Sequence, residues 1–273
     1  MASEPVQFTA GEGLTIRGEH AGEGPPIVLC HGITATRRYV VHGSRVLERA
    51  GRTVVTYDAR GHGESDPAPP GRGYGYPDLV GDLESVVAAT VGEGEFVLGG
   101  HSMGAHTAVA YALRHPERLA ALIVIGPVYA GEISDQRLEY WDGLAGALRD
   151  GGVDGFVAYV VEHTDTDPAW GETVARITRE RMLLHRNPEA LVGALREVAR
   201  SRPFDSLPQL ESLEVPALVV ASHDGADPGH PRAVAEAYAE HLPRATLTGE
   251  EEGESPLAWQ GGRLSREIAE FIL

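Results

Sequence analysis

Residues 100–104 read Gly-His-Ser-Met-Gly, and this stretch constrains the fold more than any other part of the chain. An apolar run at 96–99 precedes it and a helix-like run at 105–114 follows it, which places Ser102 on a sharp turn between a strand and a helix. Such a turn exposes the serine hydroxyl and leaves the next backbone N–H free to bind an oxyanion, while the flanking glycines let strand and helix approach closely. The pattern predicts a serine nucleophile; the structural alternative is a small residue at an ordinary turn.

Short apolar runs alternate with helical patterns along most of the chain. Runs without polar alternation are typical of strands covered on both faces, and their alternation with helices predicts a mostly parallel sheet between two helical layers. An opening hairpin adds two further strands, and one of the expected helices covers residues 36–50. The expected strands lie at residues 6–9, 14–20, 27–30, 53–57, 96–99, 120–125, 215–221 and 245–248.

The alternation stops after residue 126 and resumes at residue 214. The intervening residues contain no strand pattern and predict three or four helices, around residues 138–148, 153–161, 172–184 and 188–199. We therefore expect a core at 1–126 and 214–273 and a helical cap at 127–213. Aromatic and apolar residues of the cap either line a pocket or pack the cap onto the core, the second being the more ordinary role.

Composition narrows the classes of partner. The 273 residues carry a formal net charge of -17, which argues against nucleic acid and anionic membranes as partners. The single cysteine, Cys30, excludes an internal disulfide, and its apolar surroundings predict a buried thiol. The sequence has no secretory signal and no apolar run of about 18–20 residues. We expect a cytoplasmic protein, a monomer or homodimer, that binds a partly apolar small molecule and uses no metal or cofactor.

Four motifs in order carry a resemblance to a known superfamily. They are His-Gly at 31–32, Asp-x-Arg-Gly-His-Gly-x-Ser at 58–65, the serine turn at 100–104, and Asp224 after the strand at 215–221. With these motifs the chain resembles the α/β-hydrolase superfamily. The resemblance implies an α/β-hydrolase fold, which is an eight-stranded, mostly parallel sheet with a helical cap inserted after strand 6.

The resemblance also implies roles for individual residues. Ser102 would be the nucleophile, and the backbone N–H groups of Ile33 and Met103 would form the oxyanion hole. Asp224 would orient a catalytic histidine, with Asp227 as its nearest competitor and a loop cap as the structural alternative. Dehalogenases and epoxide hydrolases of the superfamily use a carboxylate nucleophile, so a serine at this position disfavours those reactions.

The histidine that the superfamily carries after its last strand is absent. The corresponding loop, residues 248–256, reads Thr-Gly-Glu-Glu-Glu-Gly-Glu-Ser-Pro, and no histidine follows His241. Glu254 or Ser255 stands where the histidine is expected, and the acidic run at 250–252 is interpreted as solvated. Without a base the serine hydroxyl stays protonated and is a poor nucleophile.

Three replacements for the base remain open. His230 follows Asp224 in the same loop, a cap histidine such as His163 or His185 lies above the sheet edge, and Glu254 is a carboxylate that acts directly or through a water. A carboxylate needs burial to raise its pKa before it becomes an effective base.

Two functions from different classes follow. The first is a serine-dependent, esterase-like hydrolase acting on a small acyl substrate through Ser102. The second is a degenerate member that binds a small molecule or a protein with little or no turnover, because the catalytic histidine is missing. A lyase or acyltransferase using the same pocket is a further possibility.

Overall fold

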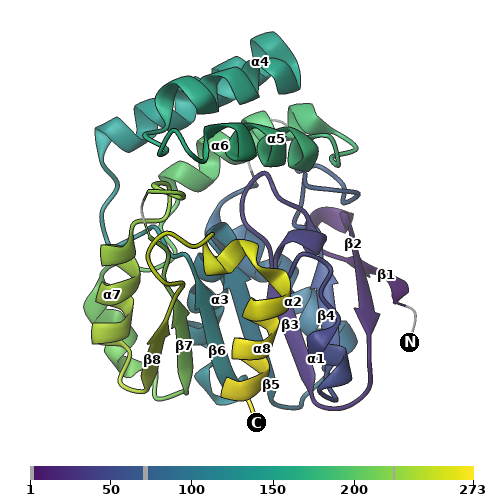
Figure 1. The fold of residues 1–273 in the computed structure, drawn as a ribbon. Helices are drawn as coiled ribbons and strands as arrows, with labels where there is room; N and C mark the ends of the chain where they lie inside the picture. Colours follow the sequence, from purple (N-terminus) through teal and green to yellow (C-terminus); the bar gives the residue numbers. More distant parts are fainter. Residues whose placement is uncertain (1–2, 70–72, 224) are drawn as a thin grey trace.

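The computed structural model describes residues 3–69, 73–223 and 225–273, and these form a three-layered α/β structure around one sheet (Figure 1). The sheet has eight strands in the order β1-β2-β4-β3-β5-β6-β7-β8, which confirms the predicted fold class. The first two strands form an antiparallel hairpin, β2 is also antiparallel to β4, and all other neighbours are parallel. The strands are β1 Glu4–Thr9, β2 Thr15–Ala21, β3 Pro26–Cys30, β4 Thr53–Tyr57, β5 Phe96–His101, β6 Leu119–Ile125, β7 Ala217–Val220 and β8 Ala245–Thr248.

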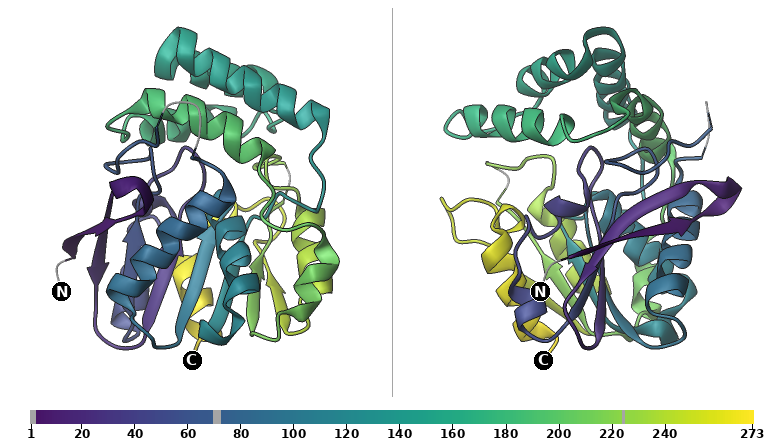
Figure 2. Two further views of the ribbon diagram at one scale, coloured as in Figure 1. Left: turned by 180° about the vertical axis from the view of Figure 1, so that it is seen from behind. Right: turned by 90° about the vertical axis from the view of Figure 1, so that its right-hand side faces the viewer.

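Helices cover both faces of the sheet (Figure 2). Because successive side chains of a strand point to opposite faces, Val28 packs with one helical layer, whereas Ile27 and Leu29 pack with the other. Full burial of each such side chain is worth about 1.5–3 kcal/mol. The first layer contains α2 (Tyr76–Thr90), α3 (Met103–Arg114) and α7 (Arg232–His241); the second contains α1 (Val46–Arg49) and α8 (Gly261–Phe271).

The helix expected at residues 36–50 is wrong for most of its length. A 3₁₀ helix at Arg37–Tyr39 and the single turn of α1 are separated by His42 and Gly43, whose φ angles are +50° and +71°. Long-range bonds favour this irregular path: the backbone N–H of Arg37 donates to Asp58, and the ring Nε2 of His42 lies 3.0 Å from the carbonyl oxygen of Ala258. Tertiary contacts thus outweigh local helical propensity here.

Three helices lie between β6 and β7 and form the helical cap: α4 (Asp135–His163), α5 (Gly171–Met182) and α6 (Leu191–Arg200). They lie above the edge at which the parallel strands end (Figure 1). Expected as two helices, α4 is continuous except for a kink at Gly152, where φ is +60° and ψ is -152°. The limits 127 and 213 for a separate domain stay a prediction.

Hydrogen bonds join the cap to the core. The backbone N–H of Tyr76 donates to Ser201 Oγ at 2.9 Å, and the N–H of Gly63 donates to His185 Nδ1 at the same distance. The cap also has a small apolar core of its own, centred on Leu144, Phe156 and Met182. Within the described residues, no helix combines the length and apolar character needed to cross a membrane.

Candidate active site

Ser102 lies where β5 passes into α3, in a conformation that few residues adopt. Its φ and ψ are +53° and -114°, a region that costs about 1–3 kcal/mol for a residue with a side chain. The two flanking glycines are required by close packing. A Cβ on Gly100 would lie 2.2 Å from the backbone of Gly104, and one on Gly104 would lie 2.1 Å from the carbonyl oxygen of Cys30. The predicted strand, turn and helix are therefore present around Ser102.

Two backbone N–H groups beside Ser102 have no acceptor among the described residues. Met103 is the first residue of α3, so its N–H belongs to the helix terminus and has no intrahelical partner. Ile33 lies in the turn after β3, beside Thr34, whose φ is +61°. In the described part of the chain neither N–H donates to a protein acceptor, and both residues line one pocket with Ser102. Their arrangement is suited to binding a developing negative charge.

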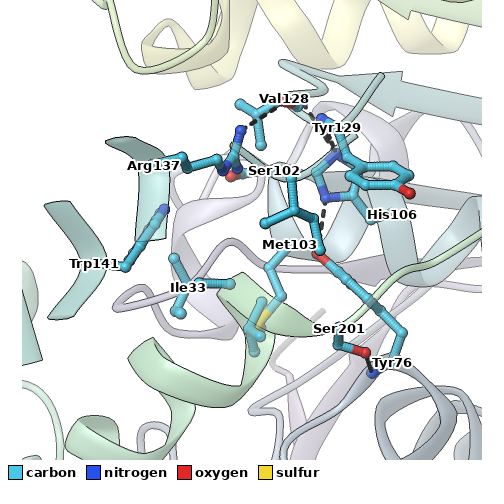
Figure 3. A pocket seen from close by; sticks show the side chains of 13 residues that line it. Ile33, Tyr76, Ser102, Met103, His106, Val128, Tyr129, Arg137, Trp141 and Ser201 are labelled. Carbon is cyan, nitrogen blue, oxygen red and sulfur yellow. Dashed lines mark hydrogen bonds between the residues drawn. The ribbon is translucent and has the colours of Figure 1, made fainter. Parts of the chain in front are cut away.

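The pocket at Ser102 lies between the sheet edge and the cap (Figure 3). Ser102 is only 8% exposed, so its surroundings are largely dry. Of the aromatic residues of α4, only Trp141 lines this pocket. Phe156, by contrast, packs inside the cap. The polar lining residues besides Ser102 are Tyr76, His106, Tyr129, Arg137 and Ser201; the others are Ile33, Met103, Val128, Ile133, Trp141, Val198 and Ala199.

His106 fixes the direction of one hydroxyl in this pocket. Its Nε2 accepts from the backbone N–H groups of Val128 at 3.0 Å and Tyr129 at 3.2 Å. The ring proton is therefore on Nδ1, which donates to Tyr76 Oη at 2.9 Å. Burial lowers the pKa of His106 well below its usual value and raises the pKa of Tyr76 well above its usual value. Both groups are neutral near pH 7.

A carboxylate and an imidazole meet in the loop after β7. His230 Nδ1 lies 2.9 Å from each carboxylate oxygen of Asp227. Burial raises the pKa of Asp227, but the charge and hydrogen bond of His230, together with the charges of His101 and Arg181, make the net shift downward. With Nδ1–H donating to the carboxylate, Nε2 carries the free lone pair that a general base needs.

This pair lies next to the serine turn. The rings of His230 and His101 are 4.8 Å apart between centroids. A Cβ on Gly126 would lie 3.2 Å from Cδ2 of His230 and 3.4 Å from Nε2 of His101, so both rings flank Gly126. The residue before Gly126, Ile125, accepts the backbone N–H of Ser102 at 2.9 Å.

Ser102 Oγ itself makes no hydrogen bond to an imidazole or a carboxylate of residues 3–69, 73–223 or 225–273. Catalytic hydrogen bonds are often long without substrate and tighten in the complex. Asp224, the expected acid, lies outside the described residues.

The other candidate bases have different surroundings. Glu254 is exposed and accepts from Arg263 at 2.6 Å, and this bond lowers the pKa of the carboxyl. His163 is exposed and stacks on Tyr159 with 3.9 Å between ring centroids. His185 accepts at Nδ1 from Gly63, and its Nε2 lies 3.0 Å from the carbonyl oxygen of Thr34, so both ring nitrogens are used.

The interpretation of residues 250–252 as solvated is wrong for Glu250. This side chain is 5% exposed and accepts from Ser222 Oγ at 3.1 Å, the N–H of His223 at 2.5 Å and the N–H of Leu257 at 2.7 Å. It joins the loop after β8 to the start of the loop that carries Asp227 and His230. Glu250 follows the last strand closely and therefore lies at the edge of the sheet that carries the pocket. This position could have indicated a buried side chain, whereas the charge of the run indicated a solvated one.

Comparison with known proteins agrees with the fold. The alpha/beta hydrolase fold family matches residues 25–254. Over 109 residues the chain is 36% identical to epoxide hydrolase B of Mycobacterium tuberculosis, a match that covers 40% of this chain and 30% of that protein. The chain thus spans less than a third of that relative's length.

Two solved structures superpose over nearly the whole chain. A thermophilic esterase from Thermogutta terrifontis has a TM-score of 0.78 at 24% identity, with 98% of each chain covered. An enol-lactonase from Burkholderia xenovorans has a TM-score of 0.77 at 23% identity, covering 97% of this chain and 99% of that one. Together with the family match over most of its length, they show that this chain belongs to the α/β-hydrolase fold family.

Proposed function

We propose that this protein is a serine-dependent, esterase-like hydrolase of small acyl substrates, with Ser102 as nucleophile and His230 as general base. The observation that carries the proposal is the Asp227–His230 pair beside the serine turn. In this pair, His230 Nδ1 lies within hydrogen-bond distance of the Asp227 carboxylate. In this proposal Asp227 takes the orienting role that sequence gave to Asp224, and His230 replaces the histidine missing after β8.

The first half of the reaction forms an acyl-enzyme. Ser102 Oγ attacks the acyl carbonyl carbon while His230 Nε2 accepts the hydroxyl proton. The carbonyl oxygen becomes an oxyanion between the N–H groups of Ile33 and Met103, each worth about 3–4 kcal/mol in related mechanisms. Collapse of this intermediate breaks the bond to the alkoxide, which receives the proton from His230.

The second half releases the acid. A water attacks the acyl carbon as His230 accepts its proton, and the same N–H groups of Ile33 and Met103 bind the new oxyanion. Collapse breaks the bond to Ser102 Oγ, which takes the proton back from His230. Asp227 stays ionised throughout and stabilises the imidazolium.

A serine nucleophile separates this chemistry from that of the epoxide hydrolase to which the chain is partly similar. Ring opening through a covalent ester intermediate requires a carboxylate at the position of Ser102. We therefore propose acyl transfer to water.

Binding without turnover is the second candidate. It is favoured by one observation, that Ser102 Oγ has no hydrogen bond to His230 among the described residues. The two candidates differ in whether Ser102 reacts.

The test combines a fluorophosphonate probe with a panel of short-chain nitrophenyl esters. The wild type is expected to be labelled and to hydrolyse esters, and Ser102→Ala to abolish both. His230→Gln is expected to lower kcat by a factor of about 10³–10⁶, as removal of the base does in other serine hydrolases. Glu254→Gln is the matched control and should leave kcat within about twofold, because an exposed group on Arg263 has no part in the reaction.

Each outcome decides between the candidates. Absence of labelling and of hydrolysis above the Ser102→Ala background would exclude the hydrolase and favour binding. A loss in Glu254→Gln equal to that in His230→Gln would remove His230 as the assigned base.

A further inference from the structure

The pocket at Ser102 contains a cation that has no counter-ion in the described part of the chain. Arg137, in the first turn of α4, lines the pocket and donates from Nη1 to the carbonyl oxygen of Val128 at 2.7 Å (Figure 3). Across residues 3–69, 73–223 and 225–273, no carboxylate forms an ion pair with this guanidinium. Burial lowers the pKa of Arg137, and the groups that oppose this shift are the phenols Tyr76 and Tyr238.

Two exposed arginines of the cap have the opposite arrangement, since each pairs with a carboxylate: Arg179 with Asp154, and Arg200 with Asp142. Removing a charge from water is unfavourable unless an opposite charge compensates for it. An arginine held in a pocket without such a partner is therefore suited to an anionic ligand.

Arg181, the other largely buried arginine of the cap, differs in one respect. Its charge acts on Asp227 and contributes to lowering the pKa of that carboxyl. It thus has an acidic neighbour in the protein, and it does not line the pocket with Ser102. Arg137 is the better candidate for a ligand contact.

Tyr76 adds a second donor to the same pocket. Because its Oη accepts from His106 Nδ1, its own hydroxyl proton is directed elsewhere, and no described residue accepts it. The hydroxyl stays protonated because burial raises its pKa well above the usual value of a phenol. Tyr76 is therefore a neutral hydrogen-bond donor beside a cation.

We propose that the acyl substrate carries a carboxylate, which the guanidinium of Arg137 and the hydroxyl of Tyr76 bind while the acyl carbonyl lies at Ser102. The guanidinium of Arg137 uses one N–H in its bond to the carbonyl oxygen of Val128. Its remaining N–H donors lie in one plane, and two of them can bind the two oxygens of a carboxylate. The inference rests on the proposed hydrolysis and narrows its substrate class to half-esters of short dicarboxylic acids.

The test compares two esters with the same four-carbon acyl chain, monoethyl succinate and ethyl butyrate. The wild type is expected to show a kcat/KM at least about tenfold higher for monoethyl succinate, since a charge-assisted hydrogen bond is worth about 1.5–3 kcal/mol, or roughly 10- to 150-fold. Arg137→Gln should bring the ratio of the two kcat/KM values close to one, Arg137→Lys should restore part of it, and Tyr76→Phe should lower it several-fold. Arg149→Gln, an exposed arginine of the same helix that pairs with Asp150, should leave the ratio unchanged.

A binding experiment separates failure of this inference from failure of the proposed hydrolysis. Succinate is titrated calorimetrically into Ser102→Ala and into the double variant with Arg137→Gln, each checked for folding by its melting temperature. Binding that weakens at least about tenfold in the double variant supports the carboxylate site, whether or not esters are cleaved.

Two results would overturn the carboxylate site. One is Ser102-dependent hydrolysis of ethyl butyrate with equal kcat/KM for both esters, which leaves the hydrolase intact. The other is succinate binding that Arg137→Gln does not alter. If Arg137→Gln fails to fold, Arg137→Lys and Tyr76→Phe supply the same comparison, and an unchanged ratio in both would contradict the proposal.

Discussion

The buried carboxylate of Glu250 connects the loop that follows β8 to the loop that follows β7. It accepts three hydrogen bonds, from Ser222 Oγ and from the backbone N–H groups of His223 and Leu257. We expect Glu250→Gln to lower the free energy of unfolding by about 1–3 kcal/mol, because an amide nitrogen would then face a backbone N–H in a buried site. Urea denaturation measures the change. Glu251→Gln is the control, since Glu251 is exposed, and should change the free energy of unfolding by no more than about 0.5 kcal/mol.

The effect should extend to the proposed active site. The backbone N–H of His223 is one of the three donors, and Asp227 and His230 lie further along the same loop. If Glu250→Gln proved as stable as Glu251→Gln, the buried carboxylate would have no structural role.

Local spacing made some of the candidate site predictable. Ser102, Ile33 and Met103 belong to turns whose geometry follows from a few neighbouring residues, so a motif in the sequence is enough to place them. The contact of His230 with Asp227 is local, because the backbone N–H of His230 donates to the carbonyl oxygen of Asp227 at 3.0 Å, but its place beside Gly126 depends on the path of the whole loop. The sequence therefore left His230 as one of several candidate bases. Arg137 belongs to no motif, and only packing of the cap onto the core brings it to the pocket.

At the scale of elements, the approach of α3 to β3 holds the serine turn in place. A Cβ on Gly104 would lie 2.1 Å from the carbonyl oxygen of Cys30 and 2.4 Å from its carbonyl carbon, which are backbone atoms that cannot rotate away. We expect Gly104→Ala to displace α3 and to lower the free energy of unfolding by about 2–4 kcal/mol, as overpacking in a core does.

A second glycine provides the matched control. Gly146 lies within α4, and a Cβ there would have no atom within 4 Å. Gly146→Ala should raise the free energy of unfolding by about 0.5–1 kcal/mol, because alanine favours the helix more than glycine does. Equal stability of the two variants by urea denaturation would mean that the close approach of α3 does not constrain the turn.

Elements that pack in the regular sheet were predictable because burial on two faces leaves a clear apolar pattern, as in β3 and β5. The structure of residues 36–50 was not predictable from their helical composition. Hydrogen bonds to Asp58 and Ala258, which are distant in sequence, favour an irregular path over the helix. The kink at Gly152 joins two predicted helices for a similar reason: α4 continues because its far half packs against the rest of the cap.

For the whole molecule, buried histidines determine how stability responds to acid. Burial lowers the pKa of His31 and, to well below its usual value, the pKa of His62; it lowers the pKa of His185 to about 4 and that of His101 to about 3. In the unfolded chain each histidine titrates near pH 6.5. Below that pH the unfolded chain binds more protons than the folded protein, so the free energy of unfolding decreases as pH falls.

The size of this effect follows from His185 and His101, whose pKa values burial lowers to about 4 and about 3. At pH 5, His185 and His101 should each lower the free energy of unfolding by about 2 kcal/mol relative to pH 8. Asp227, whose pKa is lowered, contributes to acid sensitivity only below about pH 4, so the interval between pH 6.5 and 5 isolates the histidines. The formal net charge of -17 acts in the opposite direction, because protonation relieves repulsion between acidic groups.

Urea denaturation between pH 8 and pH 5 tests this balance. We expect the wild type to lose several kcal/mol over this interval and His185→Gln to lose about 2 kcal/mol less, since glutamine binds no proton in the unfolded chain. His20→Gln, which replaces a partly exposed histidine on β2, should keep the wild-type dependence on pH. A free energy of unfolding that stays level or rises toward pH 5 would mean that relief of the acidic surface outweighs protonation of the buried imidazoles.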